Sequence, residues 1–149
     1  MAAMVDVQHK EPSKRTATAR SVVELPADVL AELLEVGDLR SAKGSVFQTA
    51  VLAGIMAAKK TGDLIPLCHP IGLDNCHIDI FLDAQQHVVI DCTATVFAKT
   101  GVEMEALVGA SIAALTVYDM CKALSHDIVV RETKLMSKTG GKRDFKRPS

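Results

Sequence analysis

Two neighbouring stretches of alternating apolar and polar residues constrain the fold of this chain more than any other feature. In residues 76–82, apolar side chains alternate with His77 and Asp79, and residues 87–97 alternate in the same way with aspartate and threonine. Because successive side chains of a strand point to opposite faces, both stretches predict strands with one buried and one wet face. The short polar segment 83–86 between them predicts an antiparallel hairpin.

The segments before this hairpin predict one strand and two helices. Residues 16–25 alternate and predict a half-buried strand. A short helix is predicted between Pro26 and Gly37, because proline is favoured where helices begin and glycine where they end. Its leucines fall on one predicted stripe: Leu30, Leu33 and Leu34. A second helix is predicted from an N-cap at Ser45 to Lys60, with Gly62 as its stop.

Two further elements follow the hairpin. The pattern predicts a long helix from about residue 105 to 125 and a strand over 128–137. The element order then predicts an α+β fold of the ferredoxin-like βαββαβ type. In that plan an antiparallel four-stranded sheet carries its helices on one face.

The long helix lacks the polar stripe expected of a helix packed on a single sheet face. Residues 106–118 are apolar or small almost all the way round. This indicates burial on a second side, and hence a homo-oligomer, with Gly109 and the neighbouring alanines allowing close helix approach. The alternative is that alanine is used only as a good helix former. The stretch is too short and too interrupted to span a bilayer.

Composition excludes several other classes of protein. The 149 residues carry a net charge of −1, so no global basic field favours nucleic acid. With no Trp, one Tyr and four Phe, the chain also lacks platforms for base stacking. The four cysteines form no CxxC pair and the N-terminus has no signal-peptide core, which predicts a cytoplasmic chain with reduced thiols and no membrane partner.

Two acidic motifs on the long helix are candidate sites. Asp119 and Lys122 are three residues apart, so they share a helix face and suit acid–base chemistry if partly buried, although an ordinary surface pair has the same spacing. Glu103 and Glu105 follow Gly101 and would converge in an extended segment, where they could bind a guanidine-like edge. As helix N-terminal acids, they would only interact favourably with the helix dipole.

Two loops are also candidates for binding. The segment 64–70 is apolar, contains two prolines and holds His69, and apolar loops are uncommon unless they line something. A zinc site combining Cys68, His69, Cys76 and His77 is discounted, because the spacing does not match zinc-binding motifs. The segment 138–142 pairs two glycines with two lysines and could approach phosphate, or could be a mobile basic tail.

Taken together, several motifs resemble the cyclic pyranopterin monophosphate synthases. The similar stretches are residues 4–7, 63–70, 99–107, 113–123 and 138–142. They occur in the family's order and cover nearly the whole chain, from Met4 to Phe145.

This resemblance implies a ferredoxin-like catalytic domain over residues 15–149 that follows a flexible arm at 1–14. It implies a homohexamer, a trimer of dimers, with active sites at subunit interfaces. It also implies a lyase of molybdenum cofactor biosynthesis that converts a cyclised dihydro-GTP to cyclic pyranopterin monophosphate with release of diphosphate. No cofactor, metal ion or nucleic acid is expected.

Position by position, the resemblance implies two sets of site residues. Asp119, Lys122 and Lys43 match catalytic positions. The positions that match substrate-contacting segments are Leu67, Cys68, His69, Glu103, Met104, Glu105, Lys138 and Arg15.

One departure concerns the tail. Residues 141–145 read Gly-Lys-Arg-Asp-Phe, one residue shorter than the family pattern, so the path of the tail is not assigned. Two other interpretations stay open: a non-catalytic nucleotide-binding module of the same fold, and a structural oligomerisation domain. The first would bind the cyclised GTP without releasing diphosphate, and the second would not bind it.

Overall fold

An antiparallel five-stranded sheet forms the frame of the computed structural model, which describes residues 2–41 and 43–148. The strands lie in the order β4-β5-β1-β6-β7. Their bounds are β1 (Ser13–Glu24), β4 (Asn75–Leu82), β5 (Val88–Ala98), β6 (Val129–Thr139) and β7 (Phe145–Lys146). The predicted hairpin is confirmed as β4–β5, and the remaining predicted strands are β1 and β6.

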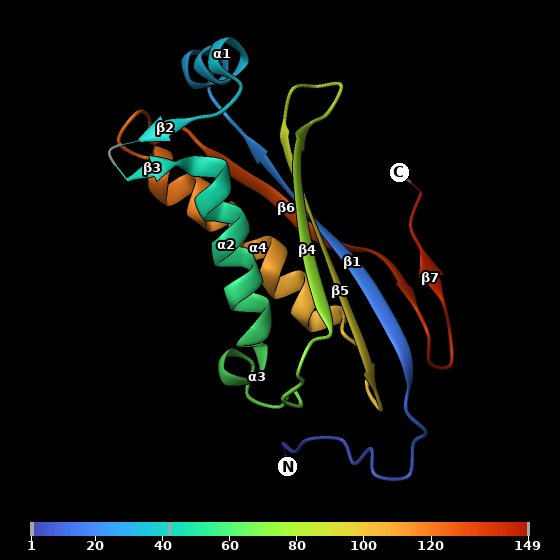
Figure 1. Ribbon diagram of the computed structural model, residues 1–149. Coiled ribbons are helices and arrows are strands. Elements are labelled where there is room, and N and C mark those ends of the chain that lie inside the picture. The colour runs from blue at the N-terminus through green and yellow to red at the C-terminus, as the bar shows by residue number, and fades with distance from the viewer. Residues whose placement is uncertain (1, 42, 149) are drawn as a thin grey trace.

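The prediction of four strands was wrong. The tail turns back after Gly140 and Gly141 and pairs as β7 with residues 137–138 of β6, which adds a fifth, edge strand (Figure 1). Both glycines have positive φ angles, 87° and 78°, which a residue with a side chain rarely adopts. This turn could not be placed from the alternation pattern, because β7 is only two residues long.

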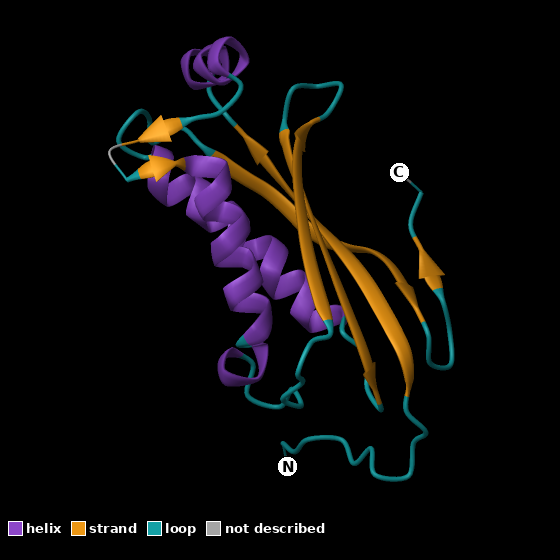
Figure 2. Ribbon diagram, viewed as in Figure 1, coloured by secondary structure: helices purple, strands orange, loops and turns teal. Residues whose placement is uncertain are grey.

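The helices gather on one side of the sheet (Figures 1 and 2). Their bounds are α1 (Ala27–Val36), α2 (Val46–Lys59), α3 (Thr61–Leu64) and α4 (Glu103–Cys121). A separate small ribbon, β2 (Arg40–Ser41) and β3 (Gly44–Ser45), precedes α2. The predicted N-cap is confirmed, since the Ser45 hydroxyl accepts a hydrogen bond from the Gln48 amide at 3.3 Å.

Three local predictions about the helices need correction. The helix α1 turns Val29 and Leu33 inward and leaves Leu34 53% exposed, so the predicted leucine stripe is displaced. After Lys60 the chain continues into the single turn α3, so Gly62 does not stop it. The long helix begins at Glu103 rather than near residue 105, and the acids at its start are compatible with the helix dipole.

Two sides of helix α4 are buried by other elements of the same chain. It packs on β1, β5 and β6 and crosses α2 at Gly54 and Gly109. A Cβ atom on Gly109 would lie 2.6 Å from the Cys92 sulfur, and one on Gly54 would lie 2.8 Å from the Gly109 carbonyl oxygen. The small residues therefore allow close helix approach, as predicted, and the helix that approaches α4 within this chain is α2.

By length and composition alone, α4 could cross a membrane, yet half of that stretch is buried inside the chain. Its small side chains fill the layer between the sheet and α2. This is the environment of a core helix, in which apolar composition follows from packing.

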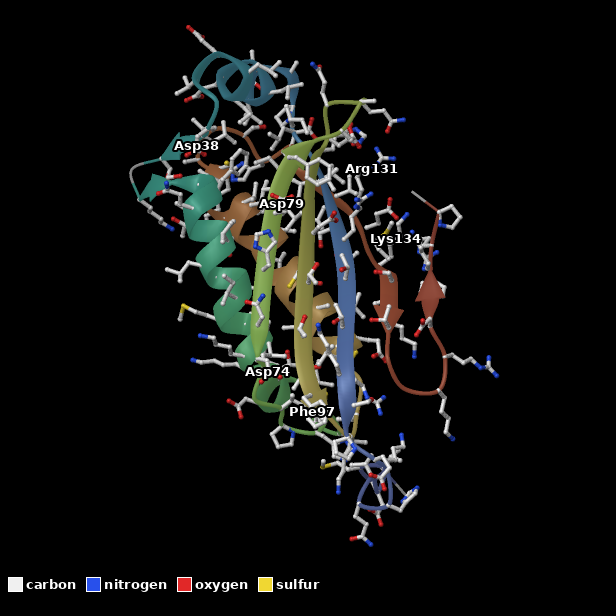
Figure 3. The ribbon with its side chains drawn as sticks, turned by 45° about the vertical axis from the view of Figure 1, so that its right-hand side comes forward. Asp38, Asp74, Asp79, Phe97, Arg131 and Lys134 are labelled. Atoms are coloured by element: carbon white, nitrogen blue, oxygen red, sulfur yellow. The ribbon has the colours of Figure 1, made fainter. Side chains whose placement is uncertain are left out.

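The sheet face away from the helices carries polar pairs between β1 and β5. Thr18 faces Thr93 with hydroxyl oxygens 2.8 Å apart, and the Arg20 guanidinium donates two hydrogen bonds to the Asp91 carboxylate at 2.7 and 2.9 Å. Figure 3 shows Phe97, which is 64% exposed, near one end of the sheet and Lys134 on β6. This polar face is the solvent-exposed face of the sheet that the alternating sequence predicted.

Candidate functional site

The C-terminal end of α4 holds a carboxylate between two lysines. Asp119 accepts from Lys122 Nζ at 2.9 Å on one oxygen and from Lys43 Nζ at 3.1 Å on the other. All three side chains are at least half exposed. The hydrogen bonds from Lys122 and then from Lys43 hold the pKa of Asp119 below its ordinary value, and the same carboxylate raises the pKa of Lys122.

Lys43 reaches Asp119 because hydrogen bonds to Asp38 hold the β2–β3 ribbon in place. Asp38 accepts hydrogen bonds from the Ser45 hydroxyl and from the Leu39 amide, and Leu39 is fully buried. The Lys43 amide donates to the Ser41 hydroxyl at 3.1 Å. The ribbon thus presents Lys43 over the end of α4, 76 residues away in sequence from Asp119.

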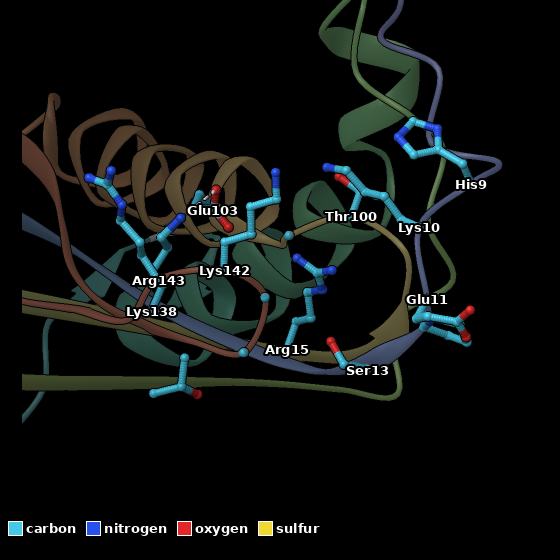
Figure 4. A pocket seen from close by; sticks show the side chains of 15 residues that line it. His9, Lys10, Glu11, Ser13, Arg15, Thr100, Glu103, Lys138, Lys142 and Arg143 are labelled. Carbon is cyan, nitrogen blue, oxygen red and sulfur yellow. Dashed lines mark ion pairs between the residues drawn. The ribbon is translucent and has the colours of Figure 1, made fainter.

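The N-terminal end of α4 borders an open basin of about 800 Å³, which Figure 4 shows from close by. Of the predicted site residues, Arg15, Glu103 and Lys138 line it, and Lys138 Nζ lies 3.9 Å from a Glu103 oxygen. We call this hollow the basin. Its walls are residues 9–13, Arg15, Thr100, Gly101, Glu103 and residues 138–143.

The two glutamates at this end point in different directions, so the extended arrangement considered from the sequence was wrong. Both lie in the first turn of α4, where residues two apart diverge. Glu103 faces the basin, whereas Glu105 is only 1% exposed and its Oε1 has no hydrogen-bond partner among the described residues. Burial raises the pKa of Glu105 above its ordinary value.

The remaining predicted residues lie near this same end. The Cys68 sulfur is 3.9 Å from Glu105 Oε2, and burial followed by the nearby carboxylate raises the pKa of Cys68. His69 lines a second hollow of about 320 Å³, which shares Thr100 with the basin. Leu67 and Met104 are partly exposed apolar residues in the adjoining segments.

The predicted site is therefore divided between the two ends of one helix. Glu103 and Asp119 are sixteen positions apart on α4, which corresponds to about 24 Å at 1.5 Å per residue. A single copy does not bring the Asp119 group and the basin residues together on one small molecule.

Some basin residues were missed by sequence reasoning. Lys10 lies in the irregular N-terminal segment, where no local pattern marks it. Lys142 was considered within the segment 138–142 that could approach phosphate, whereas Arg143, in the tail that follows, was not singled out as a site residue. Within residues 2–41 and 43–148, no group of three or more His, Cys, Asp or Glu side chains is arranged to hold a metal ion.

Comparison with known proteins agrees with the motifs. A family model described as the MoaC family matches residues 4–141. A cyclic pyranopterin monophosphate synthase of Xanthomonas campestris is 56% identical over 142 residues, covering 95% of this chain and 86% of that protein. Molybdenum cofactor biosynthesis protein 1 of Dictyostelium discoideum is 49% identical over 154 residues, covering 93% of this chain and 24% of that protein.

A third relative is the molybdenum cofactor biosynthesis bifunctional protein of Synechocystis, which is 46% identical over 145 residues; the match covers 95% of this chain and 42% of that protein. The chain thus combines an antiparallel sheet with packed helices, and it carries ionisable clusters at both ends of its core helix. It is similar in sequence to biosynthetic enzymes. The chain belongs to the MoaC family.

Proposed function

We propose that this chain is a cyclic pyranopterin monophosphate synthase. It converts (8S)-3',8-cyclo-7,8-dihydroguanosine 5'-triphosphate to cyclic pyranopterin monophosphate and diphosphate, in the biosynthesis of the molybdenum cofactor. The observation that carries this proposal is the Asp119 carboxylate between Lys43 and Lys122, in a chain 56% identical to a protein of that name.

The reaction needs proton transfers and a phosphoryl displacement without a change in redox state. Asp119 and Lys122 are placed to exchange protons with a bound ring system, and Lys43 adds a second positive charge where negative charge develops. All three polar groups are accessible to a ligand, because each side chain is at least half exposed.

The N-terminal end of α4 supplies substrate contacts in this proposal. Arg15 and Lys138 attract the phosphates, and Glu103 recognises a polar edge of the ring system. Glu105 is buried and lies against Cys68, so it does not line the basin in the single copy. The surrounding contacts come from Leu67, Cys68, His69 and Met104.

The distance between the two ends calls for a second copy. We infer a homohexamer, a trimer of dimers, in which the basin of one copy meets the Asp119 group of a neighbour. Large apolar side chains left exposed on the helical layer support further burial, including Leu52, Met56 and Leu115. In this proposal the four long strands, together with α2 and α4, form a ferredoxin-like unit to which β7 is added. The enzyme is proposed to be cytoplasmic.

Incubation with the cyclised substrate tests the reaction. Diphosphate should appear together with a pterin that becomes fluorescent after oxidation. Asp119→Asn should keep the wild-type melting temperature and abolish both products, whereas Asp79→Asn, an exposed carboxylate on β4, should leave turnover unchanged. Normal turnover by Asp119→Asn would refute the assignment, and binding without diphosphate release by the wild type would favour a nucleotide-binding module.

Mixed oligomers test the two-copy site. Asp119→Asn damages the C-terminal end of α4, and Lys138→Gln, on β6, damages the basin at the other end of that helix. When the two variants are co-expressed in equal amounts, about one quarter of the sites would combine an intact basin with an intact Asp119 group from a neighbour, so activity should partly return. No recovery above the separate variants, in oligomers shown to be mixed, would contradict a site shared between copies.

A further inference from the structure

The turn between β6 and β7 is held firmly against the start of β1. A Cβ atom on Gly141 would lie 2.5 Å from an Arg15 guanidinium nitrogen, and one on Gly140 would collide with the Lys14 carbonyl oxygen. The Gly140 amide donates to Asp144 Oδ1 at 3.2 Å, and β7 then pairs with β6. The tail residues between these anchors therefore have a defined position beside the basin.

Two basic residues of this tail, Arg143 and Lys146, differ in the surfaces that they line. Phe145 and Arg147 share a face, since the Arg147 guanidinium lies 5.4 Å from the centre of the Phe145 ring. Arg143 lines the basin and also the adjoining hollow beside Phe145. Lys146, three positions later, lines neither hollow.

The basin carries more positive than negative charge. Its cations are Lys10, Arg15, Lys138, Lys142 and Arg143, and its carboxylates are Glu11 and Glu103. Lys138 is the one cation of this set that pairs with a carboxylate within the described ranges 2–41 and 43–148. Figure 4 shows the side chains of Arg15 and Lys142 extending into the same space.

Two buried donors also lack partners there. Arg15 Nε and the Ser13 hydroxyl are inaccessible to solvent and make no hydrogen bond within the described residues. Both residues line the basin. Buried donors without acceptors are costly. A side-chain rotation that turned these two donors toward an anion in the basin would supply the missing acceptors, in addition to charge neutralisation.

From these observations we propose that Arg143 is an additional positioning residue, which holds the terminal phosphates of a polyphosphate ligand in the basin. An arginine binds a phosphate through two parallel hydrogen bonds, and the surplus of positive charge suits a ligand with several negative charges. Given the proposed function, the ligand is the triphosphate arm of the substrate, and the same contacts retain diphosphate until it leaves.

Arg143→Gln and Lys146→Gln form a matched pair of variants for the test. Each removes one positive charge from the same hairpin, but only Arg143 lines the basin. Titration of the full-length protein with inorganic tripolyphosphate should show a Kd about tenfold higher for Arg143→Gln and within about twofold of wild type for Lys146→Gln. Arg143→Lys should recover part of the loss, and both glutamine variants should melt at the wild-type temperature.

Turnover gives a second readout. With the cyclised substrate, Arg143→Gln should raise KM about tenfold, with a smaller effect on kcat, because the contact is made before the chemical step. Equal tripolyphosphate affinities for the two glutamine variants would overturn the proposal. If the wild type bound tripolyphosphate with this Arg143 dependence yet released no diphosphate from the substrate, the polyphosphate site would stand and the proposed reaction would fail.

Discussion

The two ends of α4 carry the same chemical group in opposite environments. At the N-terminal end, Glu105 is almost fully buried and forms no ion pair with the residues that the structure describes, and burial raises its pKa. At the C-terminal end, Asp119 is exposed between Lys122 and Lys43, which lower its pKa. Membership of one helix therefore does not set the pKa of a carboxyl group. The segments packed around each end decide it.

The largest expected effect belongs to the C-terminal end. Lys122→Met removes the strongest partner of Asp119 and one side of the proposed proton exchange, so kcat should fall by about 10²- to 10⁴-fold. Lys138→Met, at the opposite end, should mainly raise KM. Steady-state kinetics on the cyclised substrate would separate the roles of the two ends, and similar kcat values for both variants would contradict different roles for them.

A change in the middle of α4 should affect neither end directly. Gly109→Ala places a methyl group against the Cys92 sulfur, so the free energy of unfolding should fall by about 1–3 kcal/mol through overpacking. Denaturant titration measures the loss. Ser111→Ala, on a partly exposed position of the same helix, is the control and should change stability little. Wild-type stability for Gly109→Ala would mean that the Cys92 side chain on β5 can move away from α4 without cost.

The buried carboxyl at the N-terminal end should respond to pH through folding. A raised pKa in the folded state means that the folded protein holds the proton more tightly. Glu105 therefore costs stability as the pH rises above the ordinary carboxyl range. Glu105→Gln keeps the shape without the charge and should raise stability at neutral pH by about 1 kcal/mol, or roughly 3 °C in Tm.

Melting curves over a pH series would check this prediction. The difference between Glu105→Gln and wild type should shrink as the pH falls from the raised pKa of Glu105 toward the ordinary carboxyl range, because Glu105 then becomes neutral in both the folded and the unfolded state. Glu103→Gln, at the rim of the basin, should show no comparable gain. A Glu105→Gln variant less stable than wild type at neutral pH would show that the carboxylate is ionised and paired.

The smallest expected effect concerns the exposed carboxylate. Lys43→Met removes the weaker of the two partners, so the pKa of Asp119 should rise toward its ordinary value while Lys122 keeps it partly depressed. Titration of the Asp119 carboxyl carbon by NMR measures this shift without relying on activity. Lys142→Met removes a lysine from the basin and should leave the Asp119 pKa unchanged, whereas an equal shift in both variants would point to overall charge rather than contact.

Local patterns predicted most of the fold because they record short-range geometry. The period of two in the β4–β5 hairpin and the Ser45 cap were both readable from neighbouring residues. The strand β7 was not, since two residues carry no usable period and the pairing depends on a turn packed against Arg15. The missing polar stripe on α4 indicates burial on a second side, and only the structure shows that α2 covers that side within the chain.

In the candidate site, too, contacts between neighbouring residues were predictable and contacts between distant segments were not. Asp119 and Lys122 were predicted as neighbours, because their spacing and the helix geometry leave little freedom, and the structure brings them together. The contact of Lys43 with Asp119 crosses 76 residues and came only from family resemblance. The basin, with Lys10 and Arg143, needed the structure, since its walls come from both termini and two strands.

By itself, the sequence determined the helices and long strands, the family, and the residue types available for chemistry, because these depend on neighbouring residues and on similarity along the chain. The tertiary structure alone decided that the same helix carries a buried Glu105 with a raised pKa and an exposed Asp119 with a lowered pKa, about 21 Å or roughly four turns of helix apart. The physical reason is that a pKa depends on solvent access and nearby charges in space, and both are set by segments distant in the chain.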